Sequence, residues 1–321
     1  MSAALQPFTL SNRHGLEVDV LPLGATIMAI RYQGQLLTLG YPQPEQYLHD
    51  NFYLGATVGR YANRIAHGRC LLNGQLLQLD CNNGPHSLHG GSSGFNKAVW
   101  QVRERTVQQA ELYYCAADGE QGFPGRLQVW LQLQLQQNAL HLQFRGLSDR
   151  DTLVNLTNHC YFNLNSDGND INNHQLRLNA EHYLPTDSTA IPYGELQPVA
   201  GSVFDLRQPA ALGERLLQGD LQLQQARGFD HCFVTPQGAD GSLQWQATVS
   251  SPQSGRTLEV FSTQPGIQLY TGNYLAAPFR PRQGLCLEAQ NWPDAPNQPH
   301  FPSAQLAAGQ TYQQEIVYRF S

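Results

Sequence analysis

Charge is scarce in this sequence. Charged residues make up 14% of the 321 residues, well below the roughly 25% of a typical globular protein. The 19 basic and 25 acidic residues give a net charge of −6, and neither sign gathers into a run. Because a nucleic-acid partner needs a basic patch, these features argue against one. A small neutral polar ligand fits this balance better.

Closely spaced cysteines and long apolar runs are also missing. No two of the six cysteines form a C-x-x-C pair, so no zinc-ligand spacing is present. No run approaches the ~20 apolar residues that a membrane span needs. Residues 1–15 lack the basic and apolar regions of a signal peptide. We therefore expect a cytoplasmic protein with reduced thiols and no membrane association.

Alternation of apolar and polar residues is the dominant pattern. Over 127–135 the odd positions are Leu or Val and the even ones Gln or Trp. The alternation resumes at 140–144 after a break at 137–139, which predicts a hairpin turn. Because successive side chains of a strand point to opposite faces, each alternating run predicts a half-buried strand. Shorter alternating runs occur at 16–20, 71–79 and 175–179.

Glycine (29) and proline (19) interrupt these runs at short intervals, as in an all-β sandwich or barrel. Helical periodicity is scarce, with one short helix at 209–218 and a turn at 45–49 as the candidates. No repeat or linker divides the chain, and 250–256 is predicted to be a loop. We expect one domain over residues 1–321, all-β with very little helix.

Two motifs suggest a chemistry that their surroundings do not support. His86 and His89 form an H-x-x-H pair, but they lie in a polar loop with no acidic ligand nearby in sequence. We therefore predict no metal site. Residues 90–94 (GGSSG) match the nucleophile elbow G-x-S-x-G, which needs a strand before it and a helix after it. A glycine-rich turn is the better interpretation.

Three segments carry more polar and aromatic residues than a loop needs. Each places an ionisable residue among apolar strand residues, where burial alone would favour Leu or Val. Partly buried His and Glu cost free energy unless they are paired, so such groups are candidates for function. The segments are 59–65 (GRYANRI), 155–164 (NLTNHCYFNL) and 286–294 (CLEAQNWPD).

Together with further motifs, these segments resemble the aldose 1-epimerase (galactose mutarotase) family over nearly the whole chain. The other motifs follow in the family's order. Cys160 is a departure, because the family commonly has Ser beside this histidine. The further motifs are 24–27 (GATI), 87–91 (SLHGG), 94–100 (GFNKAVW), 183–196 (YLPTDSTAIPYGEL), 204–207 (FDLR), 228–234 (GFDHCFV), 264–273 (QPGIQLYTGN) and 287–302 (LEAQNWPDAPNQPHFP).

The resemblance implies a large antiparallel β-sandwich, the galactose mutarotase-like supersandwich. It also implies interconversion of the α and β anomers of a free aldohexose, such as galactose or glucose, without cofactor or metal. Monomer and homodimer both stay open. By position, it implies Glu288 as general base, His159 as general acid, and His89 as a residue that assists near the ring oxygen or binds the sugar. The sugar-binding residues it implies are Asn63, Arg64, Tyr161 (beside the acid), Asp230 and Gln268.

This chemistry needs one acid and one base. Ring opening removes a proton from the anomeric O1 while the ring oxygen O5 gains one, and reclosure reverses both transfers. We expect the carboxylate and the imidazole to face each other across a space the size of one pyranose. Arg64 is unsuited to proton donation, because its guanidinium stays charged, but it suits hydroxyl binding.

Other functions stay open at this point. A hexose 6-phosphate 1-epimerase needs a cationic phosphate pocket, to which Arg60 or Arg69 could contribute. A non-catalytic protein on the same fold would bind sugar without accelerating anomer exchange. A polysaccharide-cleaving enzyme is the third alternative, since a fold alone does not assign function. Its usual pair of carboxylates is not evident as a motif. Trp292 could pack against a sugar face, although a core position is favoured.

Overall fold

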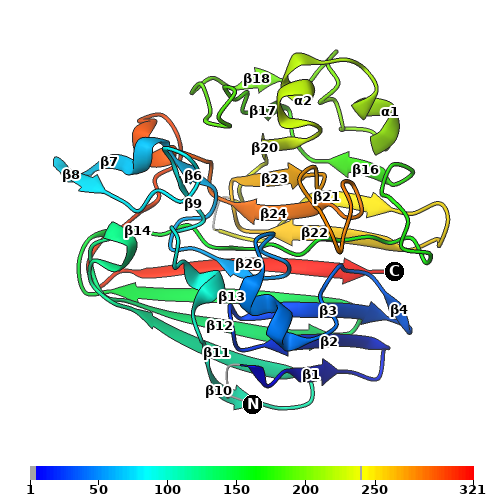
Figure 1. Ribbon diagram of the computed structural model, residues 1–321, viewed down its shortest axis with the longest axis horizontal. Coiled ribbons are helices and arrows are strands. Elements are labelled where there is room, and N and C mark those ends of the chain that lie inside the picture. Colours follow the sequence, from blue (N-terminus) through cyan, green and yellow to red (C-terminus); the bar gives the residue numbers. More distant parts are fainter. Residues whose placement is uncertain (1–4, 239–240) are drawn as a thin grey trace.

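A nine-stranded antiparallel sheet forms the centre of the computed structural model, which describes residues 5–238 and 241–321 (Figure 1). Its long central strands pair over nine or ten residues. In spatial order the strands are β10 (Gln101–Arg105), β11 (Gln109–Ala116), β12 (Leu127–Gln136), β13 (Ala139–Ser148), β26 (Thr311–Phe320), β22 (Thr257–Ser262), β21 (Gln244–Ser250), β16 (Gln175–Leu178) and β19 (Ala210–Ala211).

The alternation predicted over 127–144 is confirmed by β12 and β13. Gln136 pairs with Ala139, so Gln137 and Asn138 alone form the hairpin turn. The odd residues of β12 are buried, and the even ones through Gln134 are half-buried. Trp130 lies on this half-buried face, 3.8 Å below the guanidinium of Arg145. The guanidinium of Arg145 therefore covers part of the indole ring on this polar face.

Two smaller sheets complete the sandwich. Inward side chains of both, including Val18, Ile30 and Leu287, belong to the same hydrophobic cluster as Leu131 of β12. This confirms the predicted antiparallel β-sandwich. The first sheet contains β1 (Phe8–Ser11), β2 (Leu16–Leu21), β3 (Thr26–Tyr32) and β4 (Gln35–Leu36). The second contains, in spatial order, β18 (Gln197–Pro198), β17 (His182–Tyr183), β20 (Asp230–Val234), β23 (Gly266–Tyr270) and β24 (Cys286–Gln290).

Short two-stranded ladders accompany these larger sheets. The run at 71–79 is split by a turn at Asn73 and Gly74, so it forms a hairpin rather than one alternating strand. Leu71 and Leu76 are more than 60% exposed, because this hairpin projects from the sandwich instead of covering its core. The ladders are β5 (Thr57–Val58) with β15 (Thr157–Asn158), β6 (Arg64–Ile65) with β9 (Ser87–Leu88), β7 (Arg69–Leu72) with β8 (Gln75–Gln78), and β14 (Thr152–Leu153) with β25 (Gln305–Leu306).

Helix is confined to short segments. The helix expected at 209–218 is the shorter α1 (Leu212–Leu216), and α2 (Leu221–Ala226) was not anticipated. The Asp220 side chain caps α2 by accepting from two backbone N–H groups. No helix among the described residues is long and apolar enough to cross a membrane. The 3-10 helices are η2 (Pro44–His49, where a turn was expected), η3 (Ala66–Gly68), η4 (Phe95–Lys97), η5 (Glu120–Gly122) and η6 (Ala295–Asn297).

Candidate active site

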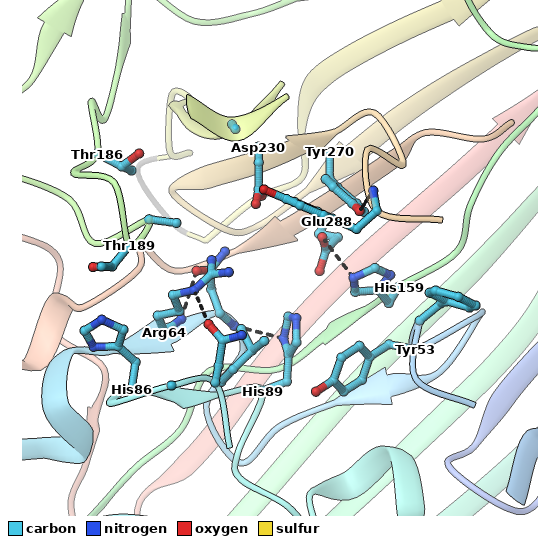
Figure 2. A pocket seen from close by; sticks show the side chains of 18 of the residues that line it. Tyr53, Arg64, His86, His89, His159, Thr186, Thr189, Asp230, Tyr270 and Glu288 are labelled. Atoms are coloured by element: carbon cyan, nitrogen blue, oxygen red, sulfur yellow. Dashed lines mark hydrogen bonds and ion pairs between the residues drawn. The ribbon is translucent and has the colours of Figure 1, made fainter. Parts of the chain in front are cut away.

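A cleft of about 530 Å³ gathers residues from widely separated parts of the sequence (Figure 2). Strand β24 supplies Glu288, the segment after β15 supplies His159, and the turn after β9 supplies His89. Strands β15 and β24 are joined where the hydroxyl of Thr157 donates to the backbone carbonyl of Ala289 (2.8 Å). Seven of the eight residues selected by the resemblance line this cleft; the exception is Gln268.

Glu288 and His159 are in closer contact than we expected. Oε1 of Glu288 lies 3.7 Å from Nε2 of His159, which leaves no space for a pyranose between them. Both side chains are buried, and Figure 2 shows them side by side on the cleft wall. The expectation of a sugar-sized gap was therefore wrong, because adjacent segments carry the two groups. A sugar must instead present its O1–C1–O5 edge to both from the open side.

Burial shifts the pKa values of Glu288 and His159 in opposite directions. It raises the pKa of Glu288 well above its ordinary value, the nearby Asp230 raises it further, and Arg64 opposes the change. Burial lowers the pKa of His159 to about 4, against a raising effect of its own backbone carbonyl. A protonated carboxyl with a neutral imidazole holds as many protons as a carboxylate with an imidazolium. The pair can therefore hold one proton that either group gives up.

His89 is restricted to one neutral form. Its Nδ1 accepts a hydrogen bond from the backbone N–H of Asn63 (3.1 Å), so we assign the ring proton to Nε2. Burial lowers the pKa of His89 well below 6.5, and His159 and Arg64 lower it further. A neutral ring with its proton on Nε2 is a hydrogen-bond donor and a poor proton source. His89 is therefore suited to donating a hydrogen bond, whereas His159, next to Glu288, is suited to transferring a proton.

The residues that come closest to a metal site in the structure are not the H-x-x-H pair. His86 and His89 do not act as a pair, because Nδ1 of His86 accepts from the backbone N–H of His67 (3.0 Å). Instead, His89, His159 and Glu288 each offer one potential ligand atom, and these three atoms lie within 4.8 Å of one another. A metal-bound histidine nitrogen must be free of its proton. The second nitrogen of His89 carries that proton, so this cluster fits hydroxyl binding and proton transfer better than a cation.

Three polar residues face the cleft beside this cluster. Arg64 donates its Nε–H to Asn83 (3.1 Å), and no described carboxylate lies within ion-pair distance of it. The side-chain carbonyl of Asn63 accepts the backbone N–H of Arg64 (2.8 Å). Asp230 lies at the start of β20 and is half-buried. The remaining guanidinium donors and the Asp230 carboxylate can therefore reach a ligand's hydroxyls.

Two selected residues lie elsewhere than expected. Gln268 is buried behind the cleft wall and donates its side-chain amide to Asp230 (2.7 Å). Tyr161 lines the cleft with its ring, 5.0 Å from the ring centre of His159. Its hydroxyl already donates to the backbone carbonyl of Phe52 (2.9 Å). Both residues are thus placed to support neighbouring side chains rather than to contact a sugar hydroxyl.

Some lining residues were not selected from the sequence. The ring of Tyr53 packs edge-on against His89 with 4.6 Å between ring centres, and 5.7 Å from His159. Tyr270 and the loop at 186–190 also line the cleft. The loop and Tyr270 lie inside the motifs 183–196 and 264–273 of the family resemblance, which are the sequence signal for them. Tyr53 has no local signal, because it lies in an ordinary aromatic stretch.

The other cations singled out in the sequence lie away from the cleft. Arg60 is buried and donates to backbone carbonyls of a neighbouring loop, while Arg69 donates to Gln78 (2.7 Å). Among the described lining residues, Arg64 is the one arginine, and none is lysine. Trp292 packs in the core and donates its indole N–H to a backbone carbonyl. In the part of the chain that the structure describes, Arg60 and Arg69 form no cationic phosphate pocket.

Gly90→Ala is expected to displace His89 and destabilise the protein. Residues 90–94 form the predicted turn; Gly90 has a φ of +88°, and an added Cβ would lie 2.0 Å from the carbonyl oxygen of Gly59. Because that oxygen belongs to the backbone, relief requires the turn to move. We expect a cost of more than ~2 kcal/mol from thermal unfolding, since strain and a clash combine, together with reduced activity.

Gly74→Ala is the matched control for this substitution. Gly74 has a similar φ of +77°, but an added Cβ meets nothing within 4 Å. This substitution should lower the free energy of unfolding only by the ~1–2 kcal/mol that a left-handed backbone costs a residue with a Cβ. The cleft should stay intact. Equal unfolding temperatures for the two variants would show that the close approach of Gly90 to Gly59 does not matter.

Comparison with known proteins identifies the family of this chain. The family model for aldose 1-epimerase matches residues 6–319. The galactose mutarotase of Sus scrofa is 42% identical over 320 residues, 95% of this chain and 91% of that protein. Crystal structures of an aldose epimerase homologue from C. elegans (TM-score 0.91, 28% identity, 99% of both chains) and of galactose 1-epimerase from Lactobacillus acidophilus (TM-score 0.89, 30% identity, 99% of this chain and 94% of that one) share the fold. The chain therefore belongs to the aldose 1-epimerase family.

Proposed function

We propose that Glu288 is the general base and His159 the general acid in the interconversion of the α and β anomers of a free aldohexose. The aldose 1-epimerase activity itself follows from the family and from the identity to galactose mutarotase. Galactose and glucose are the expected substrates. One observation supports the two roles above all: a carboxyl and an imidazole 3.7 Å apart, shielded from water, in the wall of a polar cleft.

The reaction uses the proton that this pair shares. The shared proton first moves from Glu288 to Nε2 of His159. The Glu288 carboxylate then takes the proton of O1–H, the C1–O5 bond breaks, and O5 takes the proton from Nε2 of His159, leaving an open-chain aldehyde. After rotation about C1–C2, O5 attacks C1 and the C1–O5 bond forms again, while His159 takes the proton back from O5 and Glu288 returns one to O1. Proton transfer of this type contributes ~10²–10⁴-fold, and the positioning of the sugar supplies the rest. The protein ends each cycle as it began.

The remaining residues hold the sugar and the catalytic groups. His89 donates its Nε2–H to a sugar oxygen. The guanidinium of Arg64 donates hydrogen bonds to sugar hydroxyls, and the carboxylate of Asp230 accepts them. Gln268 acts through Asp230, whose carboxylate it holds. Asn63 acts through its backbone N–H, which fixes the ring of His89. Tyr161 supports the ring of His159.

Free sugars are expected to be much better substrates than sugar phosphates. Among the described residues that line the cleft, one guanidinium is present, that of Arg64, which already contacts Asn83. A phosphate dianion is best held by several donors. We therefore expect kcat/KM for α-D-glucose and α-D-galactose to exceed that for glucose 6-phosphate by at least ~10²-fold, roughly two strong hydrogen bonds. Polarimetry of freshly dissolved sugar, corrected for uncatalysed exchange, measures this ratio.

The same assay decides between the alternatives. Faster exchange of the phosphate than of either free sugar would favour a hexose 6-phosphate 1-epimerase. Sugar binding in calorimetry without accelerated exchange would favour a non-catalytic sugar-binding protein. Membership of the family decides against the polysaccharide-cleaving enzyme.

A further inference from the structure

Strand β24 contacts both nitrogens of the His159 ring. Cys286 and Glu288 are two residues apart, so their side chains point to the same face of the strand. Sγ of Cys286 lies 3.5 Å from Nδ1 of His159, and Oε1 of Glu288 lies 3.7 Å from Nε2. One strand thus places a thiol at one ring nitrogen and the base at the other.

The surroundings of His159 give Cys286 a defined chemical state. The thiol is fully buried, and burial raises its pKa well above 9, with Glu288 and Cys160 adding to the shift. Cys286 therefore stays a neutral thiol, whose sulfur is a weak hydrogen-bond acceptor. The aromatic rings of three tyrosines also pack near His159. Among the described side chains, Cys286 alone has a polar contact with Nδ1.

We propose that Cys286 is a positioning residue whose sulfur accepts the Nδ1–H of His159 and so keeps Nε2 as the nitrogen that gives and takes the proton. The inference rests on the proposed acid role of His159. Once Nε2 has passed its proton to O5, the neutral ring must keep its other proton on Nδ1. A ring in the opposite tautomer would have no free nitrogen facing O5, so it could not take the proton back.

The two histidines of the cleft are thus held in opposite tautomers. A backbone N–H points at Nδ1 of His89 and leaves the proton on Nε2. A sulfur acceptor lies at Nδ1 of His159 and keeps the proton there. The backbone carbonyl of His159 raises the pKa of this ring and also accepts the N–H of Gly55 (3.0 Å). Among the described side chains, the acceptor at Nδ1 itself is the sulfur of Cys286.

Ring-nitrogen NMR tests this inference independently of activity. Protein labelled with ¹⁵N-histidine gives a long-range ¹H–¹⁵N spectrum that distinguishes the tautomers, and His159→Asn and His89→Asn variants assign the signals. We expect Nδ1–H for His159 and Nε2–H for His89 in the unmodified protein. Cys286→Ala and Cys286→Val should move His159 toward a tautomer mixture and leave His89 unchanged.

Kinetics of the same variants separate positioning from packing. Cys286→Ala and Cys286→Val should lower kcat about tenfold, the value of one hydrogen bond, with KM unchanged. Cys286→Ser restores an acceptor and should recover part of kcat and the Nδ1–H tautomer. Cys70→Ala is the control, because Cys70 is a buried thiol in a separate hydrophobic cluster. It should change neither the tautomers nor kcat.

The outcomes distinguish failure of this inference from failure of the proposed function. Nε2–H for His159 in the unmodified protein would overturn the role of Cys286, as would unchanged tautomer and kcat in folded Cys286→Val. A protein that leaves anomer exchange at its uncatalysed rate would contradict the proposed function instead. Val retains most of the packing, so it provides the test even if the Ala variant does not fold.

Discussion

Glu288→Gln is expected to lower kcat for exchange of α-D-galactose anomers by ~10²–10⁴-fold, the usual contribution of a general base. A side-chain amide is similar in size to the carboxyl but accepts no proton at neutral pH. The fold should survive, because the site disfavours charge: Glu288 is 2% exposed, and burial raises its pKa. The unfolding temperature should therefore match or exceed that of the unmodified protein. Polarimetry and thermal unfolding measure the two effects.

Glu315→Gln provides the control for removing a carboxylate. Glu315 lies on β26, outside the cleft lining, and its side chain contacts His141 (2.9 Å). This variant should keep the full rate of anomer exchange. A near-normal rate in folded Glu288→Gln would refute the base assignment, whatever the control shows.

His159→Asn is expected to remove most of the activity, and His89→Asn only part of it. The first substitution removes the group that exchanges a proton with O5, so a loss of at least ~10²-fold follows. The second removes a neutral hydrogen-bond donor, so we expect activity to fall about tenfold, the value of one hydrogen bond. The ordering depends on the contact between Asn63 and His89, which denies Nδ1 of that ring a proton. Initial rates from polarimetry provide the comparison.

The reverse ordering would exchange the two roles. If His89→Asn proved the more severe lesion, His89 would be the acid, and its assigned neutral tautomer would be wrong. Calorimetric binding of galactose to both variants shows whether a loss comes from the chemical step or from sugar binding.

The architecture follows from local patterns where those patterns are long. The ten-residue strands β12 and β13 each bury one face and leave the other mostly half-buried, so the alternation over 127–144 is sufficient to place them. The run at 71–79 has the same alternation, yet Leu71 and Leu76 point into solvent. Whether a strand covers the core depends on tertiary packing, which a short window of sequence does not contain.

In the site, too, some features could be predicted from the sequence and others depend on tertiary packing. Glu288 and His159 stand out as ionisable residues within apolar strands, and the family motifs suggest their roles. Their direct contact depends on how β15 meets β24, so the sequence alone suggested a wider gap. Gln268 faces Asp230 from behind because β20 and β23 are neighbours. Cys286 has no signal of its own in the sequence, because a strand cysteine is usually a small core residue.

A crystal structure of the Glu288→Gln variant with α-D-galactose tests the shared-proton pair most directly. It should show O1 about 2.6–3.2 Å from the side chain at position 288 and O5 at similar distance from Nε2 of His159. The pyranose should lie over the two side chains, with its O1–C1–O5 edge toward them. A sugar bound with that edge turned to solvent, or with His159 rotated out of reach of O5, would contradict the proposed pair.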